Sequence, residues 1–196
     1  MTASGLKVLH WYDFLCPFCY VGQQRTALLV RRGFDVVELP FRVHPESPCG
    51  GVPAGPRVGP TYRMLEHEAE VAGLPLHWPP HLPDTSRALA AAEWARQHRP
   101  AAFPQLHKSL FAAHFALGEN LEDPAVIDRH TVAAGIDRGL LNDALDGRSA
   151  AVAIMDAEAL ARKHGIRGTP AWFLSDRLIS GLRPAAEFER LATRAS

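Results

Sequence analysis

Two of the three cysteines in this chain are spaced for chemistry, in the run Cys16-Pro17-Phe18-Cys19. If a helix begins at this run, the first thiol faces the positive end of the helix dipole and unpaired backbone N–H groups, which both stabilise a thiolate. The two intervening residues place the second thiol one helical turn away, within reach of the first. We therefore expect thiol–disulfide exchange, in which Cys16 attacks a disulfide and Cys19 resolves the mixed disulfide.

The segments around the pair are suited to positioning it. Residues 6–13 are mostly apolar and rich in strand-forming residues, which predicts a buried strand. Pro17 fits the first position of a helix, where no N–H is needed, so the spacing predicts a helix over residues 16–33. Residues 34–43 alternate between apolar and polar and predict a second strand. Strand, helix and strand in this order form a βαβ unit with a right-handed crossover.

The middle of the chain has a different pattern. The segment 45–60 is dense in proline and glycine, so neither a helix nor a central strand can persist there. Beyond it, apolar periodicity between breaking residues predicts a series of helices. These helices are expected at residues 61–72, 84–98, 104–117, 123–135 and 138–145. We therefore predict that residues 46–149 form an all-helical insertion.

The last part of the chain returns to a mixed pattern. Residues 149–164 predict an amphipathic helix, and residues 184–192 predict a terminal one. Between them, two short strands at 171–174 and 177–180 flank a Ser-Asp turn, which predicts an antiparallel hairpin. The sequence thus predicts an α/β fold in which residues 1–45 and 150–196 form one domain around the insertion.

A second motif, Gly168-Thr169-Pro170, stands directly before the predicted hairpin. A proline that leads a strand is tolerated because its missing donor can face away from the neighbouring strand. Taken alone, this motif predicts no more than a turn. Its place in the chain is more informative, because the cysteine pair follows the first strand and the proline precedes the third.

This order resembles that of thioredoxin-like proteins, and the helical insertion is similar to that of the DsbA family, closest to its FrnE-like cytosolic subfamily. The likeness covers nearly the whole chain. It is carried by Asp13 with residues 16–22, by Asp84, Thr85 and Ala88, and by residues 110–115, 120–123, 165–170 and 180–181. The chain departs from the subfamily at three positions, with Phe18 in place of tryptophan or histidine, Asp84 in place of asparagine and Leu89 in place of histidine.

The resemblance implies a thioredoxin-like fold with an all-helical insertion and a cis peptide bond between Thr169 and Pro170. It also implies a substrate-binding surface formed by Thr169 and Pro170, together with Pro17 and Phe18 of the cysteine motif. Asp13 has two interpretations, a buried acid that relays a proton to Cys19 or a cap for the loop before the helix.

Cys49 and His114 are interpreted as residues without a catalytic or metal-binding role. Cys49 lies in the proline- and glycine-rich loop and is interpreted as a free thiol. A zinc site would need Cys49 and a histidine beside the pair, and no second close pair of ligands exists in the sequence. His114 lies on an apolar helix face and is interpreted as a core residue. We expect no metal site.

Three functions remain open from the sequence. The first is a disulfide oxidoreductase acting on protein or small-molecule thiols and disulfides. The second is a glutathione-dependent isomerase or transferase, because 2-hydroxychromene-2-carboxylate isomerases and kappa-class glutathione transferases look similar, although they usually carry serine where Cys16 stands. The third is a non-enzymatic, chaperone-like peptide binder that uses the groove around Pro170. We expect no tightly bound cofactor beyond a redox-active Cys16–Cys19 disulfide, with glutathione as a co-substrate.

Composition limits the partners further. The chain has 196 residues, and its 21 basic and 21 acidic side chains balance. This balance gives no general electrostatic reason to expect nucleic acid or an anionic membrane as a partner. The N-terminal segment has no basic start followed by an apolar stretch, so we expect a cytoplasmic protein if the chain is complete. A monomer and a homodimer are equally compatible with the sequence.

Overall fold

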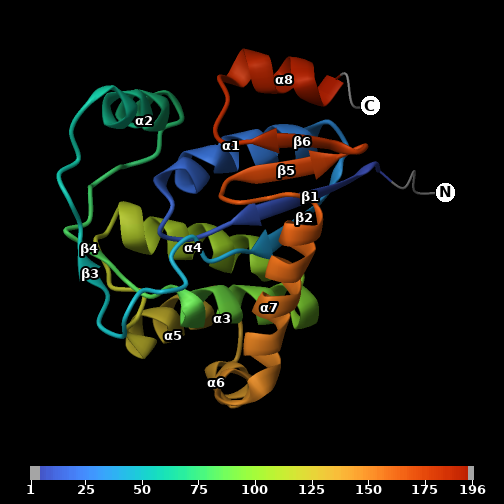
Figure 1. Cartoon of the computed structure of the whole chain (residues 1–196). Coiled ribbons are helices and arrows are strands. Elements are labelled where there is room, and N and C mark those ends of the chain that lie inside the picture. Colours follow the sequence, from blue (N-terminus) through green and yellow to red (C-terminus); the bar gives the residue numbers. More distant parts are fainter. Residues whose placement is uncertain (1–4, 194–196) are drawn as a thin grey trace.

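The computed structural model describes residues 5–193, so the first four and last three residues of the predicted outer domain lie outside the described residues. Its centre is a four-stranded sheet in the order β2-β1-β5-β6 (Figure 1). Strand β1 pairs parallel with β2 and antiparallel with β5, and β5 pairs antiparallel with β6. The predicted βαβ unit and hairpin are therefore confirmed. The strands are β1 (Lys7–Tyr12), β2 (Asp35–Pro40), β5 (Ala171–Leu174) and β6 (Arg177–Ser180).

Helices cover both faces of this sheet. On one face, helices α1 (Pro17–Arg31) and α8 (Ala185–Thr193) bury Leu29 and Phe188 against Trp172 of β5. On the other face, α7 (Arg148–Lys163) buries alanine residues against Trp11 of β1. Side chains alternate between the two faces along each strand, so both faces of β1 and β5 are apolar, as a sheet covered on two sides requires.

The insertion is helical, as predicted, and its helices lie below the sheet in the view of Figure 1, apart from α2. Helices α3 and α4 pack against each other, and α7 runs from α3 and α6 up to strand β2. The predicted domain boundary at residue 150 thus falls within α7, which contacts both parts. The helices are α2 (Pro60–Val71), α3 (Ser86–His98), α4 (Phe103–Phe115), α5 (Pro124–Ala133) and α6 (Arg138–Asp146). No helix within residues 5–193 is long and apolar enough to cross a membrane.

One detail of the insertion corrects the prediction that it is all-helical. Strands β3 (Val52–Pro53) and β4 (His81–Leu82) form a two-residue antiparallel pair. A proline is compatible with so short a pair because its missing donor leaves no buried partner unpaired. Gly51 precedes this pair with a φ of 62°, and a Cβ there would lie 2.3 Å from the Leu82 carbonyl oxygen. Only glycine permits this approach of the two segments.

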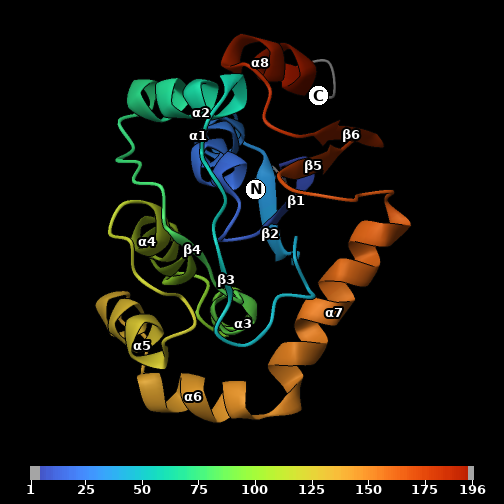
Figure 2. The ribbon, with the colours of Figure 1, turned by 60° about the vertical axis from the view of Figure 1, so that its left-hand side comes forward.

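Helix α2 lies apart from the other insertion helices, against α1 (Figure 2). Leu65 and Ala69 of α2 pack on Val21 of α1. The buried Arg25 of α1 reinforces this contact, since its guanidinium lies 2.6 Å from a carboxylate oxygen of Glu68. The first turns of α1 are thereby held between α2 and the sheet.

Gly22 lies where α1 packs on β5, and a Cβ there would already be in van der Waals contact. A Cβ on Gly22 would lie 3.4 Å from Trp172 Cη2 and 3.6 Å from Pro170 Cγ. We expect Gly22→Leu to lower the free energy of unfolding by about 2 kcal/mol, because the larger side chain overpacks this contact. Urea denaturation measures the effect. Gly55→Leu is the matched control, since no atom lies within 4 Å of a Cβ there. Equal losses in both variants would contradict the prediction.

Candidate active site

The cysteine pair lies where β1 leads into α1. Cys16 occupies the N-cap position with an extended backbone, and Pro17 takes the first helical turn, as the sequence predicts. The Cys16 carbonyl accepts hydrogen bonds from the backbone N–H groups of Cys19 and Tyr20 at 3.0 and 3.1 Å. Cys16 is 6% exposed and Cys19 is fully buried. Both cysteines are therefore buried, with Cys16 at the helix N-terminus and Cys19 one turn further into the helix.

The fold brings the second motif to this thiol across 153 positions of sequence. Cys16 Sγ donates to the backbone carbonyl of Thr169 at 3.4 Å. The Thr169–Pro170 peptide bond is cis, as the resemblance implies. The Pro170 carbonyl accepts from Gly181 N–H at 2.8 Å, which fixes the proline to the end of β6. The two motifs thus form one site at the ends of the central strands β1 and β5, made of Cys16, Cys19, Thr169 and Pro170.

The two thiols differ in acidity. Burial opposes ionisation of Cys16, but the Cys19 thiol, the Thr169 side chain and the Cys19 backbone N–H can each stabilise its thiolate, and together they outweigh burial and lower the pKa of Cys16. Burial and the adjacent sulfur of Cys16 raise the pKa of Cys19 well above its usual value. Because the thiolate is the nucleophile, this difference makes Cys16 the attacking group and keeps Cys19 protonated until Cys16 has reacted.

The Thr169 hydroxyl oxygen is buried and forms no hydrogen bond in the structure. It lies close enough to both thiols to lower the pKa of each. We expect the isosteric change Thr169→Val to raise the pKa of Cys16, because a methyl group cannot donate to a thiolate. Alkylation of Cys16 by iodoacetamide at pH 7 should become severalfold slower. Thr61→Val, on the exposed side of α2, is the control, and an unchanged rate in Thr169→Val would contradict this role.

Asp13 lies beside the pair, but its contacts favour the loop interpretation over the proton relay. Its carboxylate accepts from the Thr85 hydroxyl at 2.7 Å, from Val43 N–H at 2.8 Å and from Leu15 N–H at 3.3 Å. Burial raises the pKa of Asp13, and these three donors oppose the rise. The carboxylate thus ties the loop before Cys16 to the segment after β2 and to the start of α3.

Thr85 supports the candidate active site, although the sequence analysis assigned it no role there. It occupies the N-cap position of α3 but makes no side-chain cap hydrogen bond, because its hydroxyl is directed to Asp13 instead. The Asp-Thr pair before a helix is a cap signal in sequence and does not reveal so distant a partner. Through this bond, the helical insertion contacts the loop that presents Cys16.

The other residues of the motif pack around the site. Phe18 is partly buried and contacts the apolar clusters beneath α2 and α4. Tyr20 stacks on Phe115 with ring centroids 5.0 Å apart, and its hydroxyl donates to the Pro75 carbonyl. Each of these contacts joins the first turn of α1 to the insertion. The cysteine motif therefore contacts both the loop before β5 and the segment after α2.

Cys49 and His114, which the sequence analysis assigned no catalytic role, lie outside the candidate active site. Cys49 is exposed and unpaired in its loop. His114 is 2% exposed, and burial is the main cause that lowers its pKa to about 4, so it is a neutral core residue. Within residues 5–193, no group of three or more His, Cys, Asp or Glu side chains is placed to hold a metal ion.

Solved structures resemble this chain along almost its full length. The probable DsbA oxidoreductase SCO1869 of Streptomyces coelicolor is 22% identical, with a TM-score of 0.80 over 97% of this chain and 89% of that one. A 2-hydroxychromene-2-carboxylate isomerase is 20% identical, with a TM-score of 0.76 over 96% and 95% of the two chains. The cytosolic disulfide reductase DsbM of Pseudomonas aeruginosa, solved with GSH, is 20% identical, with a TM-score of 0.65 over 96% and 98%. At this level of identity the likeness establishes the fold.

A family model identifies the chain more directly. The model of the DSBA-like thioredoxin domain matches residues 7–192, from the first strand to the last helix. This range contains both halves of the sheet and the insertion between them, in agreement with the family that the sequence resembles. The chain belongs to the DSBA-like thioredoxin domain family.

Proposed function

We propose that this protein is a thiol–disulfide oxidoreductase whose redox centre is the Cys16–Cys19 pair. The observation that carries the proposal is the contrast between the two thiols. Cys16 occupies the N-cap of a helix and has a lowered pKa, whereas Cys19 is completely buried and has a raised pKa. This is the arrangement that sequential attack and resolution require.

The reaction follows from this arrangement. The Cys16 thiolate attacks one sulfur of a substrate disulfide, the substrate S–S bond breaks, and the departing thiolate takes up a proton. Cys19 then loses its proton and attacks Cys16 Sγ, which releases the second substrate thiol and forms the Cys16–Cys19 disulfide. The substrate gains two electrons and the pair loses two. The Thr169 backbone, which already accepts a hydrogen bond from Cys16, is the proposed contact for the substrate beside the pair, with Pro17, Phe18 and Pro170 around it.

A thiol reductant must restore the dithiol, and we propose glutathione for this step. Two glutathione molecules supply two electrons and leave as glutathione disulfide. The likeness to DsbM, a cytosolic reductase solved with GSH, supports both this co-substrate and a cytoplasmic location. In a reducing compartment a close cysteine pair serves catalysis rather than structural stapling.

Reduction of insulin disulfides by reduced glutathione tests the proposal. We expect this protein to accelerate the reaction and the Cys49→Ser variant to match it, because Cys49 lies exposed and unpaired in a separate loop. No acceleration, together with glutathione-dependent isomerisation or conjugation of an aromatic substrate, would overturn the proposal. The likeness to the isomerase would then indicate the function.

A further inference from the structure

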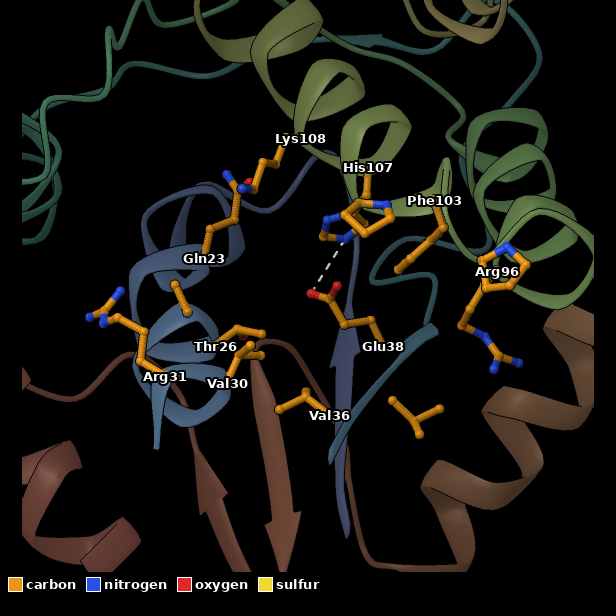
Figure 3. Close-up of a pocket in the computed structure, with 14 residues that line it drawn as sticks. Gln23, Thr26, Val30, Arg31, Val36, Glu38, Arg96, Phe103, His107 and Lys108 are labelled. Carbon is orange, nitrogen blue, oxygen red and sulfur yellow. Dashed lines mark ion pairs between the residues drawn. The ribbon is translucent and has the colours of Figure 1, made fainter. Parts of the chain in front are cut away.

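A cavity of about 530 Å³ lies away from the cysteine pair, between the second half of α1, the edge strand β2 and the helices α3 and α4 (Figure 3). Its walls are largely apolar and include Val30 of α1, Val36 of β2 and Phe103 of α4. None of the proposed redox residues lines it. The size and the apolar walls suit a small organic molecule with a ring-sized apolar body.

Two polar side chains meet inside this cavity. Figure 3 shows Glu38 of β2 and His107 of α4 directed toward each other from opposite walls. Glu38 Oε1 lies 3.7 Å from His107 Nε2, which is too far for a hydrogen bond. His107 is 3% exposed, and its Nε2 has no hydrogen-bond partner. A buried polar atom without a partner is costly, so a group that contacts both side chains would be stabilised here.

The charge states of Glu38 and His107 indicate which chemical group of a ligand could contact both side chains. Burial opposes ionisation of Glu38, but His107, His10 and Lys108 outweigh it and lower its pKa to about 2, so Glu38 is a carboxylate. Burial lowers the pKa of His107, which is therefore neutral at pH 7. A hydroxyl can donate to the carboxylate and also pair with the neutral ring nitrogen.

The rim of the cavity is positively charged, in contrast to the Glu38 carboxylate inside it. Arg31 and Lys108 both line the cavity, and within residues 5–193 neither lies within ion-pair distance of a carboxylate. The third cation, Arg96, is held by Glu93 at 2.6 Å. Two unpaired cations favour an anionic group at the mouth and disfavour a ligand whose only charge is positive.

We propose that this cavity binds an aromatic molecule with a hydroxyl at its buried end and a carboxylate at the rim. The hydroxyl bridges Glu38 and His107, the ring fills the apolar walls, and the carboxylate pairs with Arg31 and Lys108. The site is separate from the redox pair and does not depend on the function proposed for that pair.

Calorimetric titration of the full-length protein with 4-hydroxyphenylacetate tests the proposal. We expect this probe to bind about tenfold more tightly than phenylacetate, because the ligand without the hydroxyl leaves the buried His107 nitrogen unpaired, while Glu38 keeps only its contact with His10. Tyramine, which has the same ring and hydroxyl but a positive charge, should bind more weakly than 4-hydroxyphenylacetate. Equal affinities for the two carboxylates, tighter binding of tyramine, or no binding up to about 10 mM would each overturn the proposal.

Two charge-reversal variants at exposed lysines test where the ligand binds, and neither replaces a buried side chain. Lys108→Glu alters an exposed side chain and should weaken 4-hydroxyphenylacetate binding about tenfold or more by charge reversal, with insulin reduction unchanged. Lys163→Glu, at the end of α7, reverses an equivalent charge far from the cavity and should leave the affinity unchanged. Equal effects of the two variants would show that binding is non-specific and would overturn the assignment.

Discussion

Cys16→Ser should reduce insulin at no more than about one thousandth of the kcat/KM of the unchanged protein. A serine hydroxyl does not ionise at neutral pH, so the variant lacks the nucleophile that begins the exchange. The buried Cys19 cannot substitute for it, because its thiol is fully covered and its pKa is raised. Glutathione-driven insulin reduction measures the loss, with Cys49→Ser as the control cysteine substitution.

The companion variant Cys19→Ser separates attack from resolution. Cys16 should still form a mixed disulfide with the substrate, but no second thiol is available to release it. After incubation with oxidised glutathione, mass spectrometry under non-reducing conditions should therefore show one glutathione attached to Cys16 in Cys19→Ser, with glutathione as the released thiol, and none on the pair in Cys16→Ser. A stable adduct on Cys19 in Cys16→Ser would reverse the proposed roles of the two cysteines.

Asp13→Ala should lower the free energy of unfolding by about 3–4 kcal/mol. The substitution leaves a hydroxyl and two backbone N–H groups without an acceptor, at a position that is fully buried. Each unpaired buried donor costs about 1–3 kcal/mol, partly offset because the ionised carboxylate no longer has to be buried. Urea denaturation at pH 7 gives the value. Asp156→Ala, on the exposed side of α7, is the matched control and should change stability by less than about 0.5 kcal/mol.

Asp13→Asn removes the charge and can keep two of the three hydrogen bonds, because the amide oxygen can accept from Thr85 and Leu15 but the amide nitrogen cannot accept from Val43 N–H. The carboxylate of Asp13 raises the pKa of Cys16, so its neutral replacement should lower that pKa and speed alkylation of Cys16 at pH 7. The proton-relay interpretation predicts slower resolution of the mixed disulfide in the same variant. Faster alkylation with unchanged resolution would identify Asp13 as a positioning residue, and slower resolution would restore the relay.

The sequence predicted the parts of the fold that depend on local patterns. Pro17 marked the start of α1, the alternation after Phe34 marked β2, and the turn at Ser175 marked the hairpin. The predicted second strand is shorter than expected, ending at Pro40 instead of residue 43. The segment after Pro40 turns instead toward Asp13, where Val43 N–H binds the carboxylate. Local pattern cannot anticipate this end, because a distant side chain provides the competing hydrogen bond.

The candidate active site was also predictable only in part, because some of its contacts join residues that are distant in the sequence. The order of the cysteine pair and Pro170 carried the resemblance to thioredoxin-like proteins, and that resemblance implied that the two motifs lie together. The contact between Asp13 and Thr85 spans 72 positions and depends on how α3 packs beneath the sheet. Glu38 and His107 likewise meet only through tertiary structure, since they come from β2 and α4. Each of these residues has an ordinary local context, so no sequence signal distinguishes it.

The reduction potential of the Cys16–Cys19 pair tests the central claim most directly. Equilibration of the protein with mixtures of reduced and oxidised glutathione should give a reversible two-electron transition between dithiol and disulfide. The transition should be absent in Cys16→Ser and unchanged in Cys49→Ser, and its midpoint would give the direction in which the pair transfers electrons. A protein that forms no Cys16–Cys19 disulfide at any ratio of the two glutathione forms would contradict the account.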